Sequence, residues 1–196
     1  MEFNNYSDID SIDYFILEIK KTIKSKLYLS ALHLALTLPD ILGKLQYPEY
    51  GEKQSKPRFI RWFNENVYDS FDRLPMDKFF EGVPKINGEN VYQLRCKLFH
   101  ESHNDIEKDT GINEFVLSFG DQTFLTGDVA GSTTEVETGE ETKYLYVSCL
   151  ELTNYIINAA IRFKNDNPNY DYPKLKINKH GGKFPSFIVG KNYKNY

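Results

Sequence analysis

Apolar residues recur at helical spacing along most of this chain, and the period changes to strand-like alternation near residue 115 and back near residue 148. The hydrophobic period is the main sequence signal for secondary structure. It predicts a mainly α fold: a helical bundle with a small antiparallel β-hairpin or three-stranded insert before the last helix. The predicted helical domain spans residues 1–165, with the insert at about 114–148. Residues 166–196 are predicted to form an irregular, basic, aromatic-rich tail.

Three helices are predicted in the first part of the chain. Ser7 caps the first, in which an isoleucine at every third or fourth position gives one buried stripe. The second, residues 27–45, is apolar almost all round and belongs at the centre of the bundle; Pro39 either kinks it or starts a new turn. The third runs from Pro57 to about residue 71, with Trp62 flanking its apolar face.

Capping residues mark two further helices. Asn87 is a predicted N-cap, and Ile86 and Val91 form a hydrophobic staple across it. The later apolar residues of this helix, Phe99 included, are expected to face the core. Ser148 begins a capping box that opens the last helix.

Between these two helices the pattern predicts strands. Apolar and polar residues alternate over 115–119 and 122–126, on either side of Gly120-Asp121, and this pattern predicts a β-hairpin. Residues 127–142 are rich in Gly, Thr and Glu and are expected to form a loop. Residues 144–147 are predicted as a third strand.

The charge is unevenly distributed. The whole chain has a formal net charge of −4, and the last 31 residues hold six Lys against two Asp. The tail therefore carries +4 and residues 1–165 carry −8. This balance excludes a protein coated with phosphate-binding surface, so any nucleic-acid contact is expected to be local.

The composition also bears on location and cofactors. The acidic N-terminus is unlike a secretory signal, and the longest apolar run, Leu27–Leu38, is too short to span a bilayer. Cys96 and Cys149 form neither a metal-type spacing nor a disulfide framework. We therefore expect a cytoplasmic protein without membrane contact. His100 and His103 lack a clear third ligand, so no metal or other cofactor is predicted.

Arg95 and His100 form the most informative pair of side chains. An Arg is a fixed cation that can hold a phosphate, and a His titrates near neutral pH. The two lie about 140° apart on an ideal helix, so they converge only if the long Arg reaches toward a His at the helix end. Glu101 is a candidate for orienting the imidazole. The alternative is that Arg95 pairs with a carboxylate and His100 merely ends the helix.

Other polar residues have simpler interpretations. His33 lies in the apolar second helix, where a core histidine that is hydrogen-bonded to a neighbour is favoured over a catalytic one. Arg58 and Arg61 lie on one helix face and form either a basic patch or, as we favour, ion pairs with Glu65 or Asp69.

Three blocks carry a resemblance to a known family. Leu29–Gly43 is similar to the segment "ALxLALTxPDIxG" of a bacterial family, and Arg58–Phe63 is similar to its "RYIKWF" helix. Tyr92–His100 is similar to its "YxLRCxLLH". Together, over about residues 10–165, the blocks resemble the HEPN superfamily (higher eukaryotes and prokaryotes nucleotide-binding). Asp40, which lies in the first block, is a supporting site candidate.

The resemblance implies a helical bundle that forms a homodimer, with the Arg95/His100 motifs facing one another. It also implies metal-independent ribonuclease activity on RNA. Such domains are frequent in toxin–antitoxin and abortive-infection systems, so an antitoxin is a possible protein partner.

The residue after Arg95 departs from the family pattern. Active members often have Asn, Asp or His at this position, and this chain has Cys96. Cys96 remains a supporting candidate, although a thiol is a weak hydrogen-bonding group. An inactive HEPN-like module that binds nucleotide, RNA or a protein partner is therefore the alternative function. A third alternative is an interaction protein that uses its aromatic tail.

Overall fold

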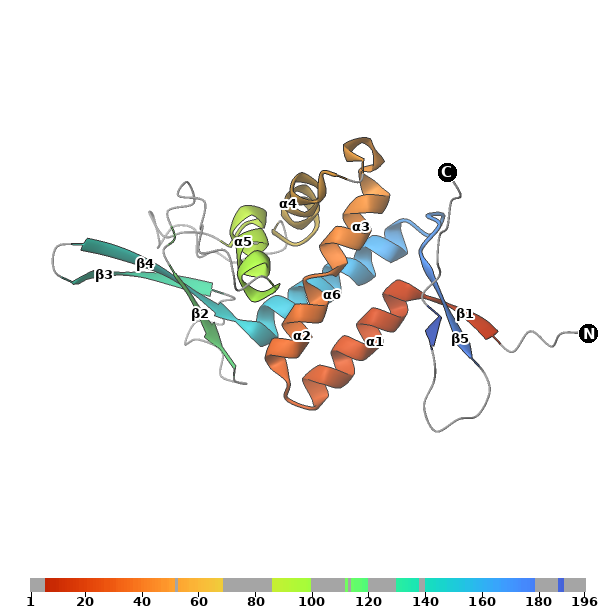
Figure 1. The fold of residues 1–196 in the computed structure, drawn as a ribbon, viewed down its shortest axis with the longest axis horizontal. Helices are drawn as coiled ribbons and strands as arrows, with labels where there is room; N and C mark the ends of the chain where they lie inside the picture. The colour runs from red at the N-terminus through yellow and green to blue at the C-terminus, as the bar shows by residue number, and fades with distance from the viewer. Residues whose placement is uncertain are drawn as a thin grey trace, which may run out of the picture.

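The computed structural model describes residues 6–51, 53–68, 86–99, 112, 114–119, 130–137, 140–178 and 187–188. Helices dominate these residues, as the sequence predicts, with short strands at both ends of the molecule (Figure 1). In chain order the elements are β1 (Tyr6–Asp10), α1 (Ser11–Lys24), α2 (Tyr28–Ala35), α3 (Leu38–Gln46), the 3₁₀-helix η1 (Pro48–Tyr50), α4 (Ser55–Asn66), α5 (Gly88–Phe99), β2 (Glu114–Ser118), β3 (Ala130–Glu137), β4 (Glu140–Ser148), α6 (Cys149–Asp166), β5 (Lys174–Asn178) and β6 (Phe187–Ile188).

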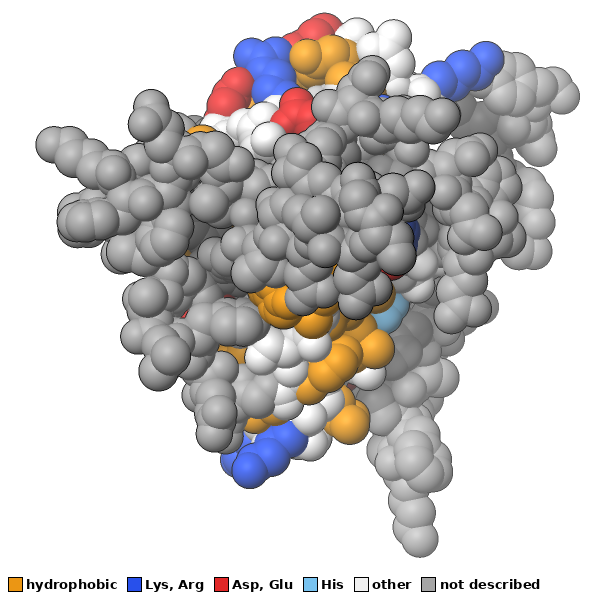
Figure 2. All heavy atoms as spheres, turned by 90° about the vertical axis from the view of Figure 1, so that its left-hand side faces the viewer, with side chains coloured by type: hydrophobic (Ala, Val, Ile, Leu, Met, Phe, Trp, Pro, Cys, Tyr) orange, Lys and Arg blue, Asp and Glu red, His pale blue; other side chains and the backbone are white. Residues whose placement is uncertain are grey.

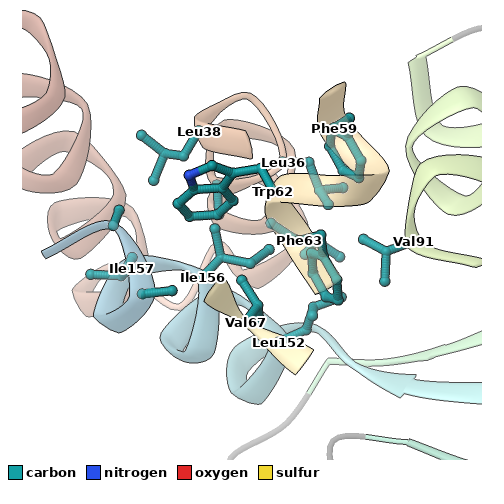
Figure 3. Packing of buried hydrophobic residues seen from close by; sticks show 14 of the residues in the cluster. Leu36, Leu38, Phe59, Trp62, Phe63, Val67, Val91, Leu152, Ile156 and Ile157 are labelled. Atoms are coloured by element: carbon teal, nitrogen blue, oxygen red, sulfur yellow. The ribbon is translucent and has the colours of Figure 1, made fainter. Parts of the chain in front are cut away.

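The helices pack as a bundle around α6. This helix contacts α1, α2, α3 and α4, and α5 packs on the outer side of α4 (Figure 1). Trp62 is fully buried rather than flanking an apolar face, because α6 covers it through Phe163 at a ring-centroid distance of 6.0 Å. Figure 3 shows Trp62 and Phe63 of α4 among aliphatic side chains of the neighbouring helices. The core therefore lies where α4 faces α6 and the α2–α3 turn.

The first helix starts later than predicted. Asp10, and not Ser7, caps α1: its Oδ1 accepts hydrogen bonds from the backbone N–H of Ile12 (2.8 Å) and Asp13 (3.3 Å). Residues 6–10 instead form β1, which pairs antiparallel with β5. A strand partner more than 160 residues away in sequence therefore overrides the local helix signal at Ser7.

The second predicted helix is two helices. α2 ends at Ala35 and α3 begins at Leu38, so Pro39 lies in the first turn of a new helix, where a missing N–H is tolerated. α4 ends at Asn66, earlier than the predicted residue 71, which lies outside the described residues.

The predicted caps of the last two helices are confirmed. Asn87 Oδ1 accepts from the backbone N–H of Asn90 at 2.9 Å, and Ser148 Oγ accepts from that of Glu151 at 3.3 Å. Both interactions join residues three positions apart, which is why the sequence alone reveals them.

The insert before α6 differs from the predicted antiparallel arrangement. β2 pairs in parallel with β4, and β3 pairs antiparallel with β4, giving the order β2-β4-β3. β3 occupies residues 130–137, inside the stretch expected to be a loop. The expected hairpin partner at 122–126 lies outside the described residues.

A second sheet forms where the two ends of the described chain meet, in the order β1-β5-β6 (Figure 1). The tail was expected to be irregular, and it instead supplies two of the three strands. Lys164 Nζ reinforces this end by contacting Asp10 Oδ2 at 2.9 Å and Asp13 Oδ1 at 2.6 Å. These ion pairs connect the start of α1 to the end of α6.

Candidate functional site

The candidate site lies where α3, α4 and α5 meet, and two glycines allow the helices to approach closely. A Cβ atom at Gly43 would lie 3.0 Å from the carbonyl oxygen of Arg58, and one at Gly88 would lie 2.5 Å from that of Ile60. The backbone N–H of Gly88 also donates to Asn64 Oδ1 at 2.6 Å. Side chains at these positions would force the helices apart. The close packing brings charged residues of three helices together.

An ion pair joins two of these helices. Arg95 Nη2 of α5 contacts Asp40 Oδ2 of α3, and their side chains are only 23% and 21% exposed. This is the pairing of Arg95 with a carboxylate that the sequence left open as an alternative. Asp40 thus lies against Arg95, and the two candidates are brought together by the fold.

Arg58 is a third charged member of the site. It is buried, and its Nη1 donates to the backbone carbonyl of Gly51. Burial raises the pKa of Asp40, while the charges of Arg95 and Arg58 act to lower it. The pKa of Asp40 is raised overall, because the loss of hydration outweighs the attraction of the two guanidinium groups. The predicted ion pair forms at Arg61, whose Nε contacts Glu65 Oε1 at 2.8 Å, and Asp69 lies outside the described residues.

Aromatic rings surround the guanidinium of Arg95. Its Cζ lies 5.8 Å from the ring centroid of Phe59, 5.7 Å from that of Tyr92 and 5.6 Å from that of Phe99. Rings at such distances attract a cation through their negative faces. Arg95 Nε and Asp40 Oδ1 are buried and have no hydrogen-bond partner among the described residues. The site thus holds Arg95 in place, and the described residues leave its Nε–H without an acceptor.

Cys96 lies beside this cluster and is half-buried. Burial raises the pKa of Tyr92, with a smaller contribution from the neighbouring Cys96. The other thiol, Cys149, is fully buried at the start of α6, and burial raises its pKa to about 11. Cys149 is therefore a core residue without the thiolate character that reactivity requires.

His33 connects α2 to the end of α5. Its Nδ1 lies 2.9 Å from the carbonyl oxygen of Leu29, and its Nε2 lies 3.3 Å from that of Leu98. Its ring meets the ring of Phe99 edge to face, with centroids 5.0 Å apart. The expected hydrogen-bonded histidine is confirmed, although its partners are backbone carbonyls and it is only half-buried.

Phe99 does not face the core as expected. Its side chain is 43% exposed, whereas Val91 and Leu94 of the same helix are 2% exposed. Phe99 is the last residue of α5.

The remaining sequence candidates are not described. His100 and Glu101 follow α5 directly but lie outside the described residues, as do His103 and His180. Sequence reasoning missed the part that Arg58 and the aromatic rings play around Arg95. Their only signal was that Arg58, Phe59 and Tyr92 all lie in the family-like blocks.

Comparison with known proteins adds no identification. No family model, curated protein or solved structure matches this chain. In the described part of the chain, no three His, Cys, Asp or Glu side chains are grouped so as to hold a metal ion. None of the described helices has the length and apolar character needed to cross a membrane.

Proposed function

We propose that this chain is a HEPN-like, metal-independent endoribonuclease in which Arg95 binds the phosphate and His100 transfers protons. One observation supports this proposal above the others: Arg95 is held by Asp40 and three aromatic rings, one turn before the end of the helix that leads into His100. A preorganised guanidinium can stabilise the charge that develops on the phosphoryl oxygens during phosphodiester cleavage.

The proposed reaction uses only side chains and the RNA. His100 removes the proton of a ribose 2′-OH, whose oxygen attacks the adjacent phosphorus while the bond from phosphorus to the 5′ oxygen breaks. A protonated histidine, from this or a second copy of the chain, gives its proton to that 5′ oxygen. The products are a 2′,3′-cyclic phosphate and a 5′-hydroxyl. Arg95 stabilises the charge that builds up on the phosphoryl oxygens.

Asp40 orients Arg95 in this proposal. Its carboxylate fixes Nη2 of the guanidinium, and the Arg95 side chain stays 23% exposed. A phosphodiester can then approach a guanidinium whose position is already set.

The alternative is a HEPN-like module that binds nucleotide, RNA or a protein partner without cleaving. Two observations favour it. The carboxylate of Asp40 already neutralises Arg95, and the residue after Arg95 is Cys96, which is engaged with Tyr92. The proposal of a HEPN-like ribonuclease includes four further expectations. They are a toxin–antitoxin or abortive-infection role, a homodimer with facing motifs, an antitoxin partner and a cytoplasmic location.

Cleavage of RNA in the presence of EDTA tests the proposal. We expect the purified protein to cut single-stranded RNA and leave 2′,3′-cyclic phosphate ends. His100→Ala should lower the rate by ~10²–10⁴-fold and Arg95→Ala by ~10²–10³-fold, as for other acid–base and charge-stabilising groups. His103→Ala is the matched control, because it removes a neighbouring histidine that has no role in this mechanism.

The results separate the two functions. Cleavage that survives His100→Ala, or that needs a metal, rules out the proposed mechanism. Tight RNA binding by the wild type without any cleavage, weakened by Arg95→Ala, supports the binding module instead.

A further inference from the structure

We propose that Phe99 is a nucleobase-binding residue, against which a base of single-stranded RNA packs while the adjacent phosphate meets Arg95. This inference rests on the proposed function, since it requires that Arg95 binds a phosphate. It adds a second contact that makes the substrate an unpaired nucleotide rather than a phosphate group alone.

The first observation is that Phe99 stays exposed although a buried position would stabilise the fold. Burying a Phe side chain stabilises a fold because it removes apolar surface from water, and α5 already buries Val91 and Leu94. A single exposed apolar residue is common on protein surfaces, so exposure alone indicates no ligand. What matters is which groups lie next to it.

The second observation is the distance between Phe99 and a cation. The Arg95 Cζ lies 5.6 Å from the ring centroid of Phe99. The two groups match the two parts of a nucleotide, which carries an aromatic base and a phosphate on one ribose. Proteins that bind single-stranded nucleic acid combine cations for the backbone with aromatic rings for the bases.

The third observation is that Phe99 is held in position. The ring of His33 meets it at an interplanar angle of 80°, and His33 Nε2 lies within hydrogen-bond distance of the carbonyl of Leu98, the preceding residue. An exposed side chain that is already ordered loses less conformational entropy when a ligand binds. His33 is therefore a positioning residue for Phe99.

The surroundings favour RNA over a protein partner. Hydrophobic side chains are visible on the face of the molecule shown in Figure 2. Phe99 differs from the exposed Leu17, Leu27 and Leu29 because the Arg95 guanidinium lies 5.6 Å from its ring. An apolar protein surface would cover the exposed part of that guanidinium without giving it a hydrogen-bond acceptor. A nucleotide supplies an anion for the guanidinium and a flat apolar ring for Phe99. The base must be unpaired to reach the ring.

RNA binding by Phe99 variants tests the proposal. The experiment uses the full chain carrying His100→Ala, so that the RNA is not cut, and measures the Kd for a labelled single-stranded RNA by fluorescence anisotropy. The same RNA without its bases is the second probe. We expect Phe99→Leu to weaken binding roughly 5- to 100-fold, the range for loss of one stacked base, and Phe99→Trp to preserve binding.

On the RNA without bases, Phe99→Leu should lower the affinity much less than on the RNA with bases, because no base is present to stack and only the contact of the ring with the Arg95 guanidinium is lost. Leu17→Ala is the matched control: Leu17 is 46% exposed, close to the 43% of Phe99, but lies on α1. Thermal unfolding and light scattering of each variant establish that the fold and the oligomeric state are unchanged.

Three outcomes overturn the inference. If the protein binds RNA through Arg95 but Phe99→Leu binds as tightly, Phe99 has no base-binding role and the proposed function stands. If Phe99→Leu changes the oligomeric state and not the RNA affinity, Phe99 is a protein contact. If Arg95→Ala has no effect on binding, the proposed function fails together with this inference.

Discussion

At the scale of single residues, Asp40 is a charged side chain that positions the Arg95 guanidinium but adds little to the stability of the fold. Its carboxylate loses hydration by lying between Arg95 and Arg58, and burial raises its pKa despite both positive charges. When desolvation outweighs attraction in this way, an ion pair adds little to folding. What the pair does provide is a fixed place for the Arg95 guanidinium.

We therefore predict that Asp40→Asn changes the free energy of unfolding at neutral pH by less than about 1 kcal/mol. Asn keeps an oxygen that accepts a hydrogen bond from Arg95 but has no charge to desolvate. The measurement is urea unfolding. Glu49→Gln is the control, because it removes the exposed partner of Arg61, and we expect a similarly small change. A loss of 3 kcal/mol or more for Asp40→Asn would show that the ion pair does stabilise the fold.

The same variant should alter the pH dependence of stability. Because the folded-state pKa of Asp40 is raised, the native protein binds this proton more tightly than the unfolded chain. Its contribution to stability is then fully present below about pH 4, the ordinary pKa of Asp, and is lost as the pH rises through the raised value. Subtracting the unfolding free energies of Asp40→Asn from those of the wild type across pH 3–8 isolates this contribution. A difference that grows with rising pH would contradict the direction of the shift.

At the scale of elements, α5 depends on a contact at its first residue. The hydrophobic pattern and the Asn87 cap locate the helix along the chain, but Gly88 decides how closely it approaches α4. Its place against the Ile60 backbone and the Asn64 side chain leaves no room for a Cβ atom. The position of Arg95, two turns later, follows from this contact.

We predict that Gly88→Ala destabilises the protein by about 1–3 kcal/mol, as overpacking at a close contact does. Helix propensity alone would favour Ala over Gly by about 1 kcal/mol, so the sign of the change decides between the two effects. Glu89→Ala, at the exposed next position, is the control and should change stability little. Urea unfolding measures both variants. A stabilised Gly88→Ala protein would mean that α5 moves away from α4 without cost.

At the scale of the whole molecule, the chain is closed by pairing between its two ends. β1 and β5 pair over five residues each, and the backbone N–H of Ser11 donates to the carbonyl of Pro173 at 2.8 Å. Lys164 adds ion pairs to Asp10 and Asp13. The tail is thus part of the fold at this end of the bundle.

We predict that deletion of residues 174–196 lowers the stability of the bundle and removes the protection of the β1 amides against hydrogen exchange. The deletion takes away the hydrogen-bonding partner of β1, and backbone groups without a partner exchange readily. The control is deletion of residues 189–196 alone, which leaves β5 and β6 in place. Unchanged β1 protection after the longer deletion would show that β1 holds its place without β5.

The sequence by itself determined that the chain is mainly helical and which residues cap α5 and α6. The helical period depends on residues three or four positions apart. The cap hydrogen bonds likewise join near neighbours, Asn87 with Asn90 and Ser148 with Glu151, so the local sequence is enough to predict them. Asp10 in place of Ser7 and the parallel pairing of β2 with β4 were mispredicted because strands distant in the sequence decide them. β3 was mispredicted as a loop although its partner β4 follows it directly, with Glu137 opposite Glu140.

Only the tertiary structure decided the site. The sequence singled out Arg95 and left its partner open. The approach of α3, α4 and α5 at Gly43 and Gly88 brings Asp40 and Arg58 to it. The same packing leaves the Phe99 side chain exposed, although the helical period predicted that it faces the core. Periodicity reports which residues share a helix face, but how far a neighbouring helix extends along that face depends on packing between segments far apart in the chain.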